Sequence, residues 1–451
     1  MARDAASFEC TACGQASGKW LGRCPTCGGW NTFEAVPEKR RPADRQRTVS
    51  PTPISSADLH DFPRISSGLP GLDRVLGGGF VTGSVVLLAG EPGVGKSTLL
   101  LQVAALMAGD GPVLYLSAEE SNRQVALRAH RLGCVHDGIA LLAEPVVEVA
   151  VEAARRMKPR LLIADSVQTM LSERVPAVAG SVTQVREVAS QLLDLAKRDG
   201  PTVVLVGHVT KEGLVAGPKS LEHIVDVLLD FSGGSALPYR SVRATKNRFG
   251  PAMELALFQM TDQGLHEVAN ASAALLSDRR LDAAGSAVAA VIEGTTPLLV
   301  EVQALVSRSS LVNPRRIAQG VDAGRLALLL AVLERRAGLR LADRDVFVNV
   351  VGGITVDEPA LDLPLAAAVL SAANDTPLPG DLVLFGELGL LGEVRGVART
   401  EERLREAAAL GFRRCALAAT AGPPPRSDVA LVTLERIADL ARLLLEEAPQ
   451  G

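Results

Sequence analysis

Short apolar runs alternate with longer amphipathic stretches between about residue 57 and residue 270. The runs that predict strands are SVVLLAG (84–90), PVLYLS (112–117), RLLIADS (160–166), TVVLVGH (202–208) and IVDVLLDF (224–231). Strands that are apolar throughout are buried on both faces, which is typical of parallel sheets covered by helices on each side. The pattern therefore predicts an α/β domain over 57–272.

The order of strands and helices changes after an Ala/Ser/Asp segment near 270–285. Two strand-like runs, VAAVIEG and LLVEVQALV, come first, and helix-like RLALLLAVLERRAG, strand-like DVFVNVVGG and helix-like LPLAAAVLSAA follow. This grouping predicts a separate α+β domain over 283–451. At the other end, residues 34–56 combine Pro, Ser and charge without an apolar period, so we expect a linker after a small domain at 1–33.

The length and net charge of the chain limit the classes of protein to which it can belong. The chain has 451 residues, which suggests roughly three domains of about 100 to 200 residues each. Its net charge of −4 gives no global positive field, so any nucleic-acid surface must be local. No apolar run has the roughly 18 residues of a spanning helix and the first residues do not resemble a secretion signal, so we expect a cytoplasmic protein with no membrane partner.

Four of the six cysteines lie in the first 27 residues. Cys10 and Cys13 form one C-x-x-C pair, Cys24 and Cys27 form a second, and ten residues separate the pairs. Two such pairs supply the four thiolates of a tetrahedral zinc site without needing a hydrophobic core. Because these residues offer no open coordination position, we predict a structural Zn²⁺ site.

Trp20 and Trp30 flank the second cysteine pair and are the only tryptophans of the chain. We expect their rings to pack over the zinc site. The alternative is that they stack on nucleic-acid bases.

The strongest catalytic motif is GEPGVGKST, which follows an apolar strand and leads into the helix-like run LLLQVAALM. It fulfils the pattern G-x-x-x-x-G-K-[ST] of a phosphate-binding loop in the required strand–loop–helix context. Lys96 is expected to reach the β/γ-phosphates, and Ser97 and Asp165, which ends the run RLLIAD, to hold Mg²⁺. The residues predicted to contact the nucleotide are Gly90, Glu91, Pro92, Gly93, Val94, Gly95, Lys96, Ser97 and Thr98.

Three further polar residues end strands of the same predicted sheet. Glu119 and Glu120 follow PVLYLS, and we expect Glu119 to orient or activate the attacking water. A solvated acidic pair that caps the next helix is the alternative. His208 ends TVVLVGH, where it could sense the γ-phosphate or serve as an ordinary structural histidine.

Taken together, the sequence motifs resemble those of the bacterial RadA (Sms) family of DNA repair proteins. They are the zinc knot with KWLGRCPTCGGWNT and the strings GEPGVGKST, LYLSAEES, GHVTKEG, AGPKSLEHIVD and ATKNRFG. This family belongs to the RecA/DnaB-like ATPase superfamily, and the resemblance covers essentially the whole chain. It implies a hexameric ring that hydrolyses ATP, is stimulated by DNA and acts as a helicase or translocase. It also implies binding of single-stranded and branched DNA and branch migration in homologous recombination alongside the recombinase RecA.

The resemblance assigns roles to the segment KNRFG (246–250). Lys246 and Arg248 lie two apart on an expected strand, so their side chains project to one face. In the family they meet the nucleotide of a neighbouring subunit or contact DNA, and the sequence does not separate these roles. The alternative is an exposed basic strand end.

Two segments correspond to the DNA-binding loops of RecA-like proteins. The first, 171–183, carries Arg174, and the second, 209–222, carries Lys211 and Lys219. In a ring, each subunit would present these side chains to the DNA backbone in the channel. Ordinary polar loops are the alternative.

From about residue 283 the chain resembles the proteolytic domain of Lon, above all at GELGLLGEV (386–394). Lon cleaves peptides with a Ser–Lys dyad. In our register Ala360 takes the place of the serine, and the lysine position falls near Glu401. Without a nucleophile and a base that activates it, acyl transfer has no route, so we expect no peptidase activity.

Overall fold

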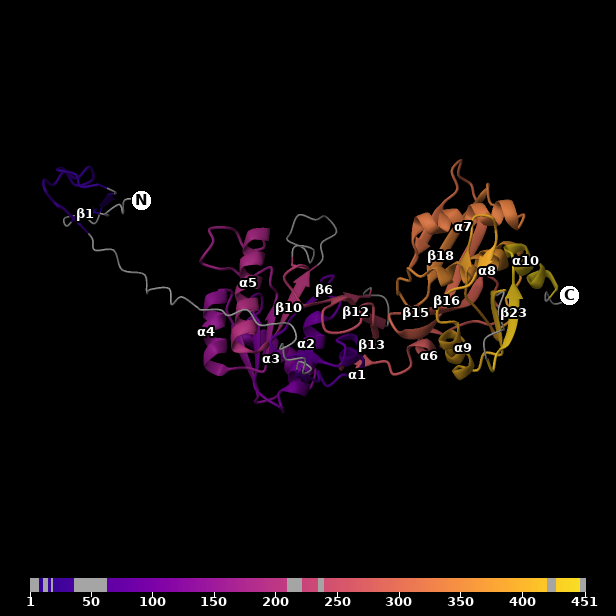
Figure 1. Cartoon of the computed structure of the whole chain (residues 1–451), viewed down its shortest axis with the longest axis horizontal. Coiled ribbons are helices and arrows are strands. Elements are labelled where there is room, and N and C mark those ends of the chain that lie inside the picture. The colour runs from indigo at the N-terminus through magenta and orange to yellow at the C-terminus, as the bar shows by residue number, and fades with distance from the viewer. Residues whose placement is uncertain are drawn as a thin grey trace, which may run out of the picture. The chain divides into compact units, whose positions relative to one another are not determined.

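The structure is a computed structural model that describes residues 8–10, 15–17, 19–35, 63–208, 221–233, 239–419 and 427–446 (Figure 1). The chain forms two compact units, Met1–Asp61 and Phe62–Gly451. Within the described ranges, no helix combines the length and the apolar character needed to cross a membrane.

The small unit contains one three-stranded antiparallel sheet in the order β2-β1-β3. Its strands are β1 (Phe8–Cys10), β2 (Ala16–Ser17) and β3 (Phe33–Ala35). Buried Cys10, Cys24 and Phe33 form its core, with Phe8 and Leu21 packed against them. A core of this size is too small to stabilise a fold alone, which is the usual setting for a structural metal.

The large unit begins with a nine-stranded sheet in the order β14-β13-β12-β11-β6-β10-β9-β7-β8. Its strands are β6 (Val85–Gly90), β7 (Val113–Ser117), β8 (Ile139–Ala143), β9 (Leu161–Asp165), β10 (Thr202–His208), β11 (Val227–Ser232), β12 (Tyr239–Asn247), β13 (Leu255–Thr261) and β14 (Gly264–Glu267). The strands from β11 to β8 pair in parallel, and β12, β13 and β14 add an antiparallel edge. All five strands predicted from apolar runs are present, and the predicted α/β architecture is confirmed.

Helices cover both faces of this sheet. They are α1 (Pro70–Val75), α2 (Lys96–Met107), α3 (Asn122–Arg131), α4 (Val147–Met157) and α5 (Val182–Asp199), and a short ribbon pairs β4 (Arg64–Ile65) with β5 (Phe80–Val81). Along β6, Val86 and Leu88 belong to the core that contains α2, whereas Val85 and Leu87 belong to the core that contains α5. Successive side chains therefore alternate between two cores, as a sheet buried on both faces requires.

A second sheet, drawn from orange to yellow in Figure 1, has the order β17-β18-β16-β15-β19-β22-β23. Its strands are β15 (Ser286–Glu293), β16 (Thr296–Arg308), β17 (Arg316–Gln319), β18 (Arg344–Val350), β19 (Leu382–Leu384), β22 (Arg414–Ala418) and β23 (Ala430–Leu434), and a hairpin pairs β20 (Glu387–Leu388) with β21 (Val394–Arg395). The helices are α6 (Ala271–Leu275), α7 (Ala323–Arg336), η3 (Pro359–Leu361), α8 (Asp362–Asn374), α9 (Thr400–Ala409) and α10 (Ile437–Glu446). Helix α8 is buried along most of its length and contacts β15, β16, α7 and α10. This region is α+β as expected, and the predicted boundary between 272 and 283 stays a prediction because both sheets belong to one compact unit.

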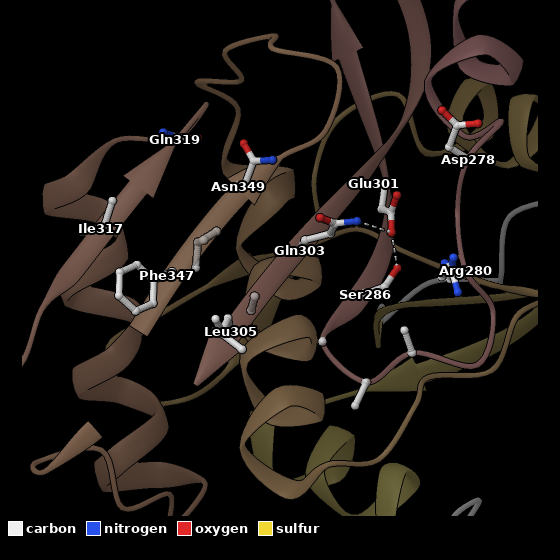
Figure 2. Close-up of a pocket in the computed structure, with 15 residues that line it drawn as sticks. Asp278, Arg280, Ser286, Glu301, Gln303, Leu305, Ile317, Gln319, Phe347 and Asn349 are labelled. Carbon is white, nitrogen blue, oxygen red and sulfur yellow. Dashed lines mark hydrogen bonds between the residues drawn. The ribbon is translucent and has the colours of Figure 1, made fainter. Parts of the chain in front are cut away.

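A cavity of about 510 Å³ lies beside strands β16, β17 and β18. Figure 2 shows the side chains that line it. The buried carboxylate of Glu301 accepts hydrogen bonds there from the Ser286 hydroxyl (2.6 Å) and the Gln303 amide (3.1 Å). The three side chains form a polar network whose buried acceptor is satisfied within the sheet.

The turn between β15 and β16 contacts the nine-stranded sheet through polar groups. The buried Glu254 carboxylate accepts hydrogen bonds from the Thr295 backbone N–H (2.8 Å) and the Thr296 hydroxyl (3.2 Å). Nearby, Arg243 of β12 lies 3.0 Å from the carboxylate of Glu293. These buried contacts tie the strand that leads to Lys246 to the second sheet.

The stability of the large unit is expected to fall with rising pH through Glu293. Burial raises the pKa of Glu293 to about 7, Arg243 opposes this shift, and Glu358 and Asp357 add to it. The folded state therefore holds a proton that the unfolded state releases, so stability is lost between about pH 4.5 and 7, by about 3 kcal/mol at most. Urea unfolding at pH 5 and pH 8 should show this loss in the wild type and a smaller one in Glu293→Gln, and equal losses in both would contradict it.

Candidate active site and metal centre

The loop from Gly90 to Thr98 joins β6 to the first turn of α2. A Cβ atom at Gly90 would lie 2.3 Å from the carbonyl oxygen of Phe231, so no other residue fits there. Gly93 and Gly95 have φ values of 78° and 116°, which L side chains rarely adopt. The glycines thus let the backbone turn closely around a ligand at the N-terminus of α2, where backbone N–H groups and the helix dipole favour anions.

Lys96, the first residue of α2, is buried at this loop. Its ammonium donates hydrogen bonds to the carbonyl oxygens of Gly90 (2.8 Å) and Glu91 (2.9 Å). Burial lowers its pKa, and the charges of Asp165 and Glu119 oppose that shift. The ammonium group is therefore held inside the loop that would surround the phosphates.

Asp165 lies at the carboxyl end of β9, and its carboxylate accepts a 2.6 Å hydrogen bond from the Tyr115 hydroxyl. Ser97, on the first turn of α2, lies close to the same tyrosine hydroxyl. A serine hydroxyl and a carboxylate are the oxygen donors that Mg²⁺ takes beside nucleotide phosphates. The donor set at this edge of the sheet therefore fits the predicted magnesium site.

Glu119, two residues beyond the end of the neighbouring strand β7, faces two polar residues of this edge. The Ser166 hydroxyl donates a 2.6 Å hydrogen bond to Glu119 Oε1, and His208 Nε2 lies 3.7 Å from the same oxygen. By contrast, the Glu120 carboxylate pairs with Arg128 at 2.5 Å. Glu119 is thus the acidic residue of the pair that lies with the other candidate side chains.

His208 ends β10 directly beside the phosphate-binding loop. Burial and the positive charge of Lys96 lower its pKa, while Glu119 and Asp165 oppose the shift. Its ring is therefore mainly uncharged at neutral pH. Within the described part of the chain, its buried Nδ1 atom has no hydrogen-bond partner.

Lys246 and Arg248 both contact the segment that precedes β11. The Lys246 ammonium donates to the backbone carbonyls of Glu222 and Val225, the latter at 2.9 Å. Arg248 lies one residue beyond the end of β12 and places Nη1 3.3 Å from the buried carboxylate of Asp226. Burial and the charge of Arg248 lower the pKa of Lys246. Lys246 is thus anchored in the chain, whereas the Arg248 side chain is 54% exposed.

Of the three candidate DNA-contacting residues, the structure describes one, Arg174. Arg174 is mostly exposed and lies 3.7 Å from Glu148 and 3.8 Å from Glu187, distances typical of weak surface ion pairs. Lys211 and Lys219 fall outside the described residues. The role of all three stays a prediction.

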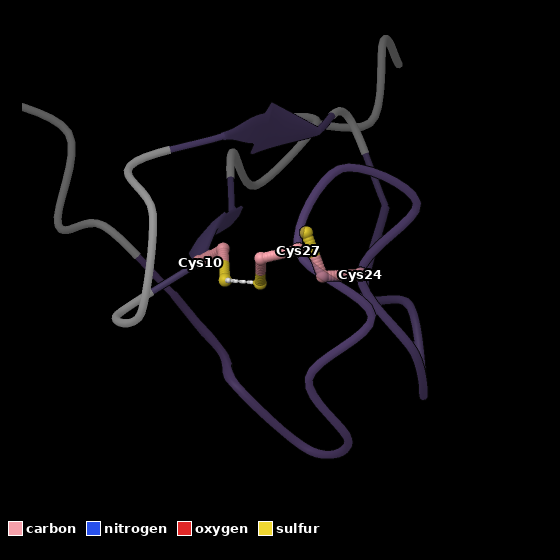
Figure 3. Close-up of side chains that lie close together, drawn as sticks. All are labelled: Cys10, Cys24 and Cys27. Carbon is pink, nitrogen blue, oxygen red and sulfur yellow. Dashed lines mark hydrogen bonds between the residues drawn. The ribbon is translucent and has the colours of Figure 1, made fainter.

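Three of the four predicted zinc ligands converge in the small unit (Figure 3). The sulfur atoms of Cys10, Cys24 and Cys27 all lie within 4.8 Å of one another, and Cys10 Sγ lies 3.7 Å from Cys27 Sγ. Thiolates of a tetrahedral zinc site, each about 2.3 Å from the metal, are separated by about 3.8 Å. The sulfur positions therefore fit Zn²⁺, and the fourth predicted ligand, Cys13, lies outside the described residues.

The two tryptophans do not pack over the cysteines, and the expectation that they would is wrong. Trp20 and Trp30 are 51% and 70% exposed. The Trp20 indole donates to the Phe33 carbonyl oxygen (3.0 Å), and Arg23 stacks over the Trp30 ring. Phe33 fills the small core instead, so both indoles remain on the surface, and the base-stacking alternative stays a prediction.

Removing zinc is expected to unfold the small unit only. Because both tryptophans belong to residues 1–33, tryptophan fluorescence reports on this unit alone. With a strong chelator we expect the anisotropy of this emission to fall, because Trp20 loses its hydrogen bond and Trp30 loses its contact with Arg23. We expect an unchanged melting transition of the large unit and unchanged basal ATP hydrolysis. Loss of the large unit's transition on chelation would contradict the assignment of a local, structural metal.

The sequence reasoning missed three polar side chains of the site. Tyr115 lies in an otherwise apolar strand, Ser166 follows Asp165 directly, and Asp226 precedes β11 and accepts hydrogen bonds from the Val85 backbone N–H and from Lys197. Their positions inside or beside buried strands could have identified them, because a buried polar group needs a specific hydrogen-bond partner.

Family models match three parts of the chain. A model described as an AAA domain matches residues 51–213, one described as a rubredoxin metal binding domain matches 8–35, and one described as subunit ChlI of Mg-chelatase matches 329–421. The first covers the phosphate-binding loop, the second covers the cysteine cluster, and the third lies in the region that resembles Lon.

Curated relatives decide the family. DNA repair protein RadA of Bacillus subtilis (strain 168) is 46% identical over 423 residues, which are 92% of each chain. RadA of Pseudomonas aeruginosa is 46% identical over 449 residues, which are 97% of this chain and 99% of its own. The chain belongs to the RadA family of DNA repair proteins. The RadA of Escherichia coli (strain K12) is likewise 46% identical, over 92% of this chain and 93% of its own.

Membership in the RadA family and the AAA match identify the large unit's first sheet as an ATPase core that uses ATP. The architecture of the whole chain agrees with the expected one. A zinc ribbon comes first, a mixed sheet with a phosphate-binding loop follows, and a ChlI/Lon-like region comes last. Among solved structures, a KaiC-like protein from Pyrococcus horikoshii OT3 aligns with 46% of this chain and 99% of its own at 23% identity, with a TM-score of 0.37.

Proposed function

We propose that this RadA-family chain is a DNA-dependent ATPase that binds single-stranded and branched DNA and promotes branch migration in homologous recombination and repair, acting with RecA. The observation that carries the ATPase part is the convergence of Lys96, Glu119, Asp165 and His208. They lie at or just beyond the carboxyl ends of the adjacent parallel strands β6, β7, β9 and β10, so their side chains meet at one edge of the sheet. Ligands of open α/β sheets bind at this edge.

Each side chain then has a defined part in hydrolysis. The loop amides and Lys96 bind the β/γ-phosphates, and Ser97 and Asp165 hold Mg²⁺, which neutralises phosphate charge when bound. A water molecule attacks the γ-phosphorus, its proton passes to the Glu119 carboxylate, and ADP leaves with the β-phosphate oxygen. The hydrogen bond from Ser166 to Oε1 of Glu119 fixes the orientation of this carboxylate.

His208 provides the route from the nucleotide to DNA. It is the last described residue before the predicted DNA loop 209–222, which carries Lys211 and Lys219. Its uncharged ring lies beside Lys96 and Glu119, so it can form a hydrogen bond with a γ-phosphate oxygen and respond to its loss. In the proposed hexameric ring, six copies of the loop and of Arg174 compensate for the small basic charge per chain.

The test is ATP hydrolysis and unwinding of a forked DNA by the purified full chain. Single-stranded DNA should stimulate hydrolysis several-fold, and unwinding should occur without RecA and be lost in Lys96→Ala. Hydrolysis that ignores DNA would refute the DNA-dependent motor. Unwinding that requires RecA would instead favour an ATP-driven loader of RecA.

No peptidase activity is expected from the Lon-like region. Ala360 is fully buried and offers only a methyl group, and the carboxylate of Glu401 lies exposed on α9. Neither can supply the nucleophile or the base of a Ser–Lys dyad. Incubation with casein and ATP should leave casein intact, and ATP-dependent cleavage that Glu401→Ala abolishes would contradict this expectation.

A further inference from the structure

The hydroxyl of Tyr115 lies between the two candidate ligands of Mg²⁺. Tyr115 is 1% exposed, in the middle of β7, and pairs across the sheet with Ile163 of β9, two residues before Asp165. From there its hydroxyl donates a 2.6 Å hydrogen bond to Asp165 Oδ2. Among the described residues it is the one side chain that donates a hydrogen bond to this carboxylate.

The same hydroxyl also contacts Ser97. Ser97 lies near enough to the hydroxyl to act on it electrostatically. A phenol hydroxyl that donates to Asp165 can accept a hydrogen bond from a serine hydroxyl at the same time.

We propose that Tyr115 is a positioning residue that holds Asp165 and Ser97 in the arrangement needed to bind the nucleotide's divalent cation. This inference rests on the proposed magnesium site. Engaging Oδ2 of Asp165 fixes the plane of the carboxylate and leaves Oδ1 as the acceptor that can face the metal. The contact with Ser97 ties the loop before α2 to the end of β9, two segments that are far apart in the sequence.

The chemistry of the cation explains why such a link matters. Mg²⁺ requires near-ideal octahedral geometry at about 2.0–2.1 Å, so small rotations of a ligand weaken binding. Hydrogen-bond partners behind a metal ligand typically contribute about 10- to 100-fold in metal affinity. The aromatic ring alone would fill the same space without fixing either oxygen, which separates the role of the hydroxyl from that of the ring.

The experiment measures Mn²⁺ binding by electron paramagnetic resonance in the full chain loaded with a non-hydrolysable ATP analogue. We expect Tyr115→Phe to weaken Mn²⁺ binding about 10-fold while the affinity for the analogue in EDTA is unchanged. The matched control is Tyr239→Phe, because Tyr239 is the only other tyrosine and its hydroxyl donates to the Ala274 carbonyl oxygen at 3.2 Å. This control should bind Mn²⁺ as the wild type does.

Asp165→Asn separates failure of this inference from failure of the metal site itself. If Asp165→Asn binds Mn²⁺ as tightly as the wild type, the proposed magnesium site is wrong. If Asp165→Asn weakens binding and Tyr115→Phe does not, only the positioning role of Tyr115 is wrong. Equal weakening of analogue binding in EDTA by Tyr115→Phe would also overturn it, because that result indicates a general defect of the site.

A second measurement avoids any change at Tyr115 that could impair folding. In Tyr239→Phe labelled with 3-fluorotyrosine, the fluorine spectrum contains one signal, from position 115. Mn²⁺ with the analogue should broaden this signal strongly, because a paramagnetic ion held by Asp165 would relax a nucleus on the residue that donates to Asp165. A signal that stays sharp would overturn the proposal.

Discussion

Replacement of Lys96 by alanine is expected to lower the kcat of ATP hydrolysis by about 100-fold or more. The ammonium of Lys96 is buried in the phosphate-binding loop, where its charge acts in a medium that screens it poorly. No other cation of this loop can replace it, because the nine residues of GEPGVGKST contain one basic side chain. Steady-state hydrolysis at saturating Mg²⁺ and single-stranded DNA measures the effect.

The matched control for this loss is Lys158→Asn. Lys158 is exposed at the end of α4 and has a φ of 52°, a conformation that asparagine tolerates. It removes one positive charge from the same unit without touching the loop, so its kcat should equal that of the wild type. If Lys96→Ala kept more than about a tenth of wild-type kcat, the loop would not be the site of hydrolysis.

Local sequence was sufficient to predict the elements that surround the nucleotide. The motif at Gly90–Thr98 occupies nine adjacent residues. Its glycines are needed because the backbone there either has positive φ values or passes very close to another backbone atom, and these features involve few distant residues. Asp165 and His208 were found because each polar residue ends an apolar run. In a parallel sheet such ends meet at one edge, so strand order was not needed to bring them together.

Contacts between distant residues were not predictable in the same way. Tyr115 and Asp165 are fifty positions apart, and their hydrogen bond depends on β7 and β9 being neighbours in register. Of the antiparallel strands, β12 was expected only around Lys246, and β13 and β14 were not predicted, because the apolar run of β13 has four residues (LALF) and β14 has none of that length. Trp20 and Trp30 were misplaced for the opposite reason, since a bulky apolar residue predicts burial only where a core is large enough to receive it.

The structure narrows the possible roles of Arg248, which the sequence alone leaves open. The sequence offered a role at a neighbouring nucleotide, a role on DNA and a mere basic strand end. The buried carboxylate of Asp226 holds one side of the guanidinium, and Lys197 contacts the same carboxylate at 2.8 Å. A guanidinium has five N–H donors in a rigid fork, so a single anchoring contact leaves donors for an external phosphate.

Arg248→Ala is expected to abolish hydrolysis in rings made of this variant alone, with a loss of about 1,000-fold or more in kcat. An arginine that reaches across an interface neutralises charge that develops on the transferred phosphoryl group, and it adds to the charge that Lys96 supplies from within the loop. Arg156→Ala, which removes an exposed arginine whose one ion pair within the described residues is with Glu152, is the control and should retain wild-type kcat.

Mixing two inactive variants tests whether this arginine acts between subunits. In a ring that contains both Arg248→Ala and Lys96→Ala chains, an Arg248→Ala subunit keeps its own Lys96 and can receive Arg248 from a Lys96→Ala neighbour. Random assembly of equal amounts restores about a quarter of the sites in a cyclic ring, so activity should recover to about that fraction of wild type. An arginine that acted on its own subunit's nucleotide would give no recovery at any ratio. An arginine that contacted only DNA would leave the basal, DNA-free hydrolysis of Arg248→Ala intact, so that the variant would not be inactive before mixing. The two measurements together thus assign Arg248 to the nucleotide of the neighbour, to its own nucleotide or to DNA.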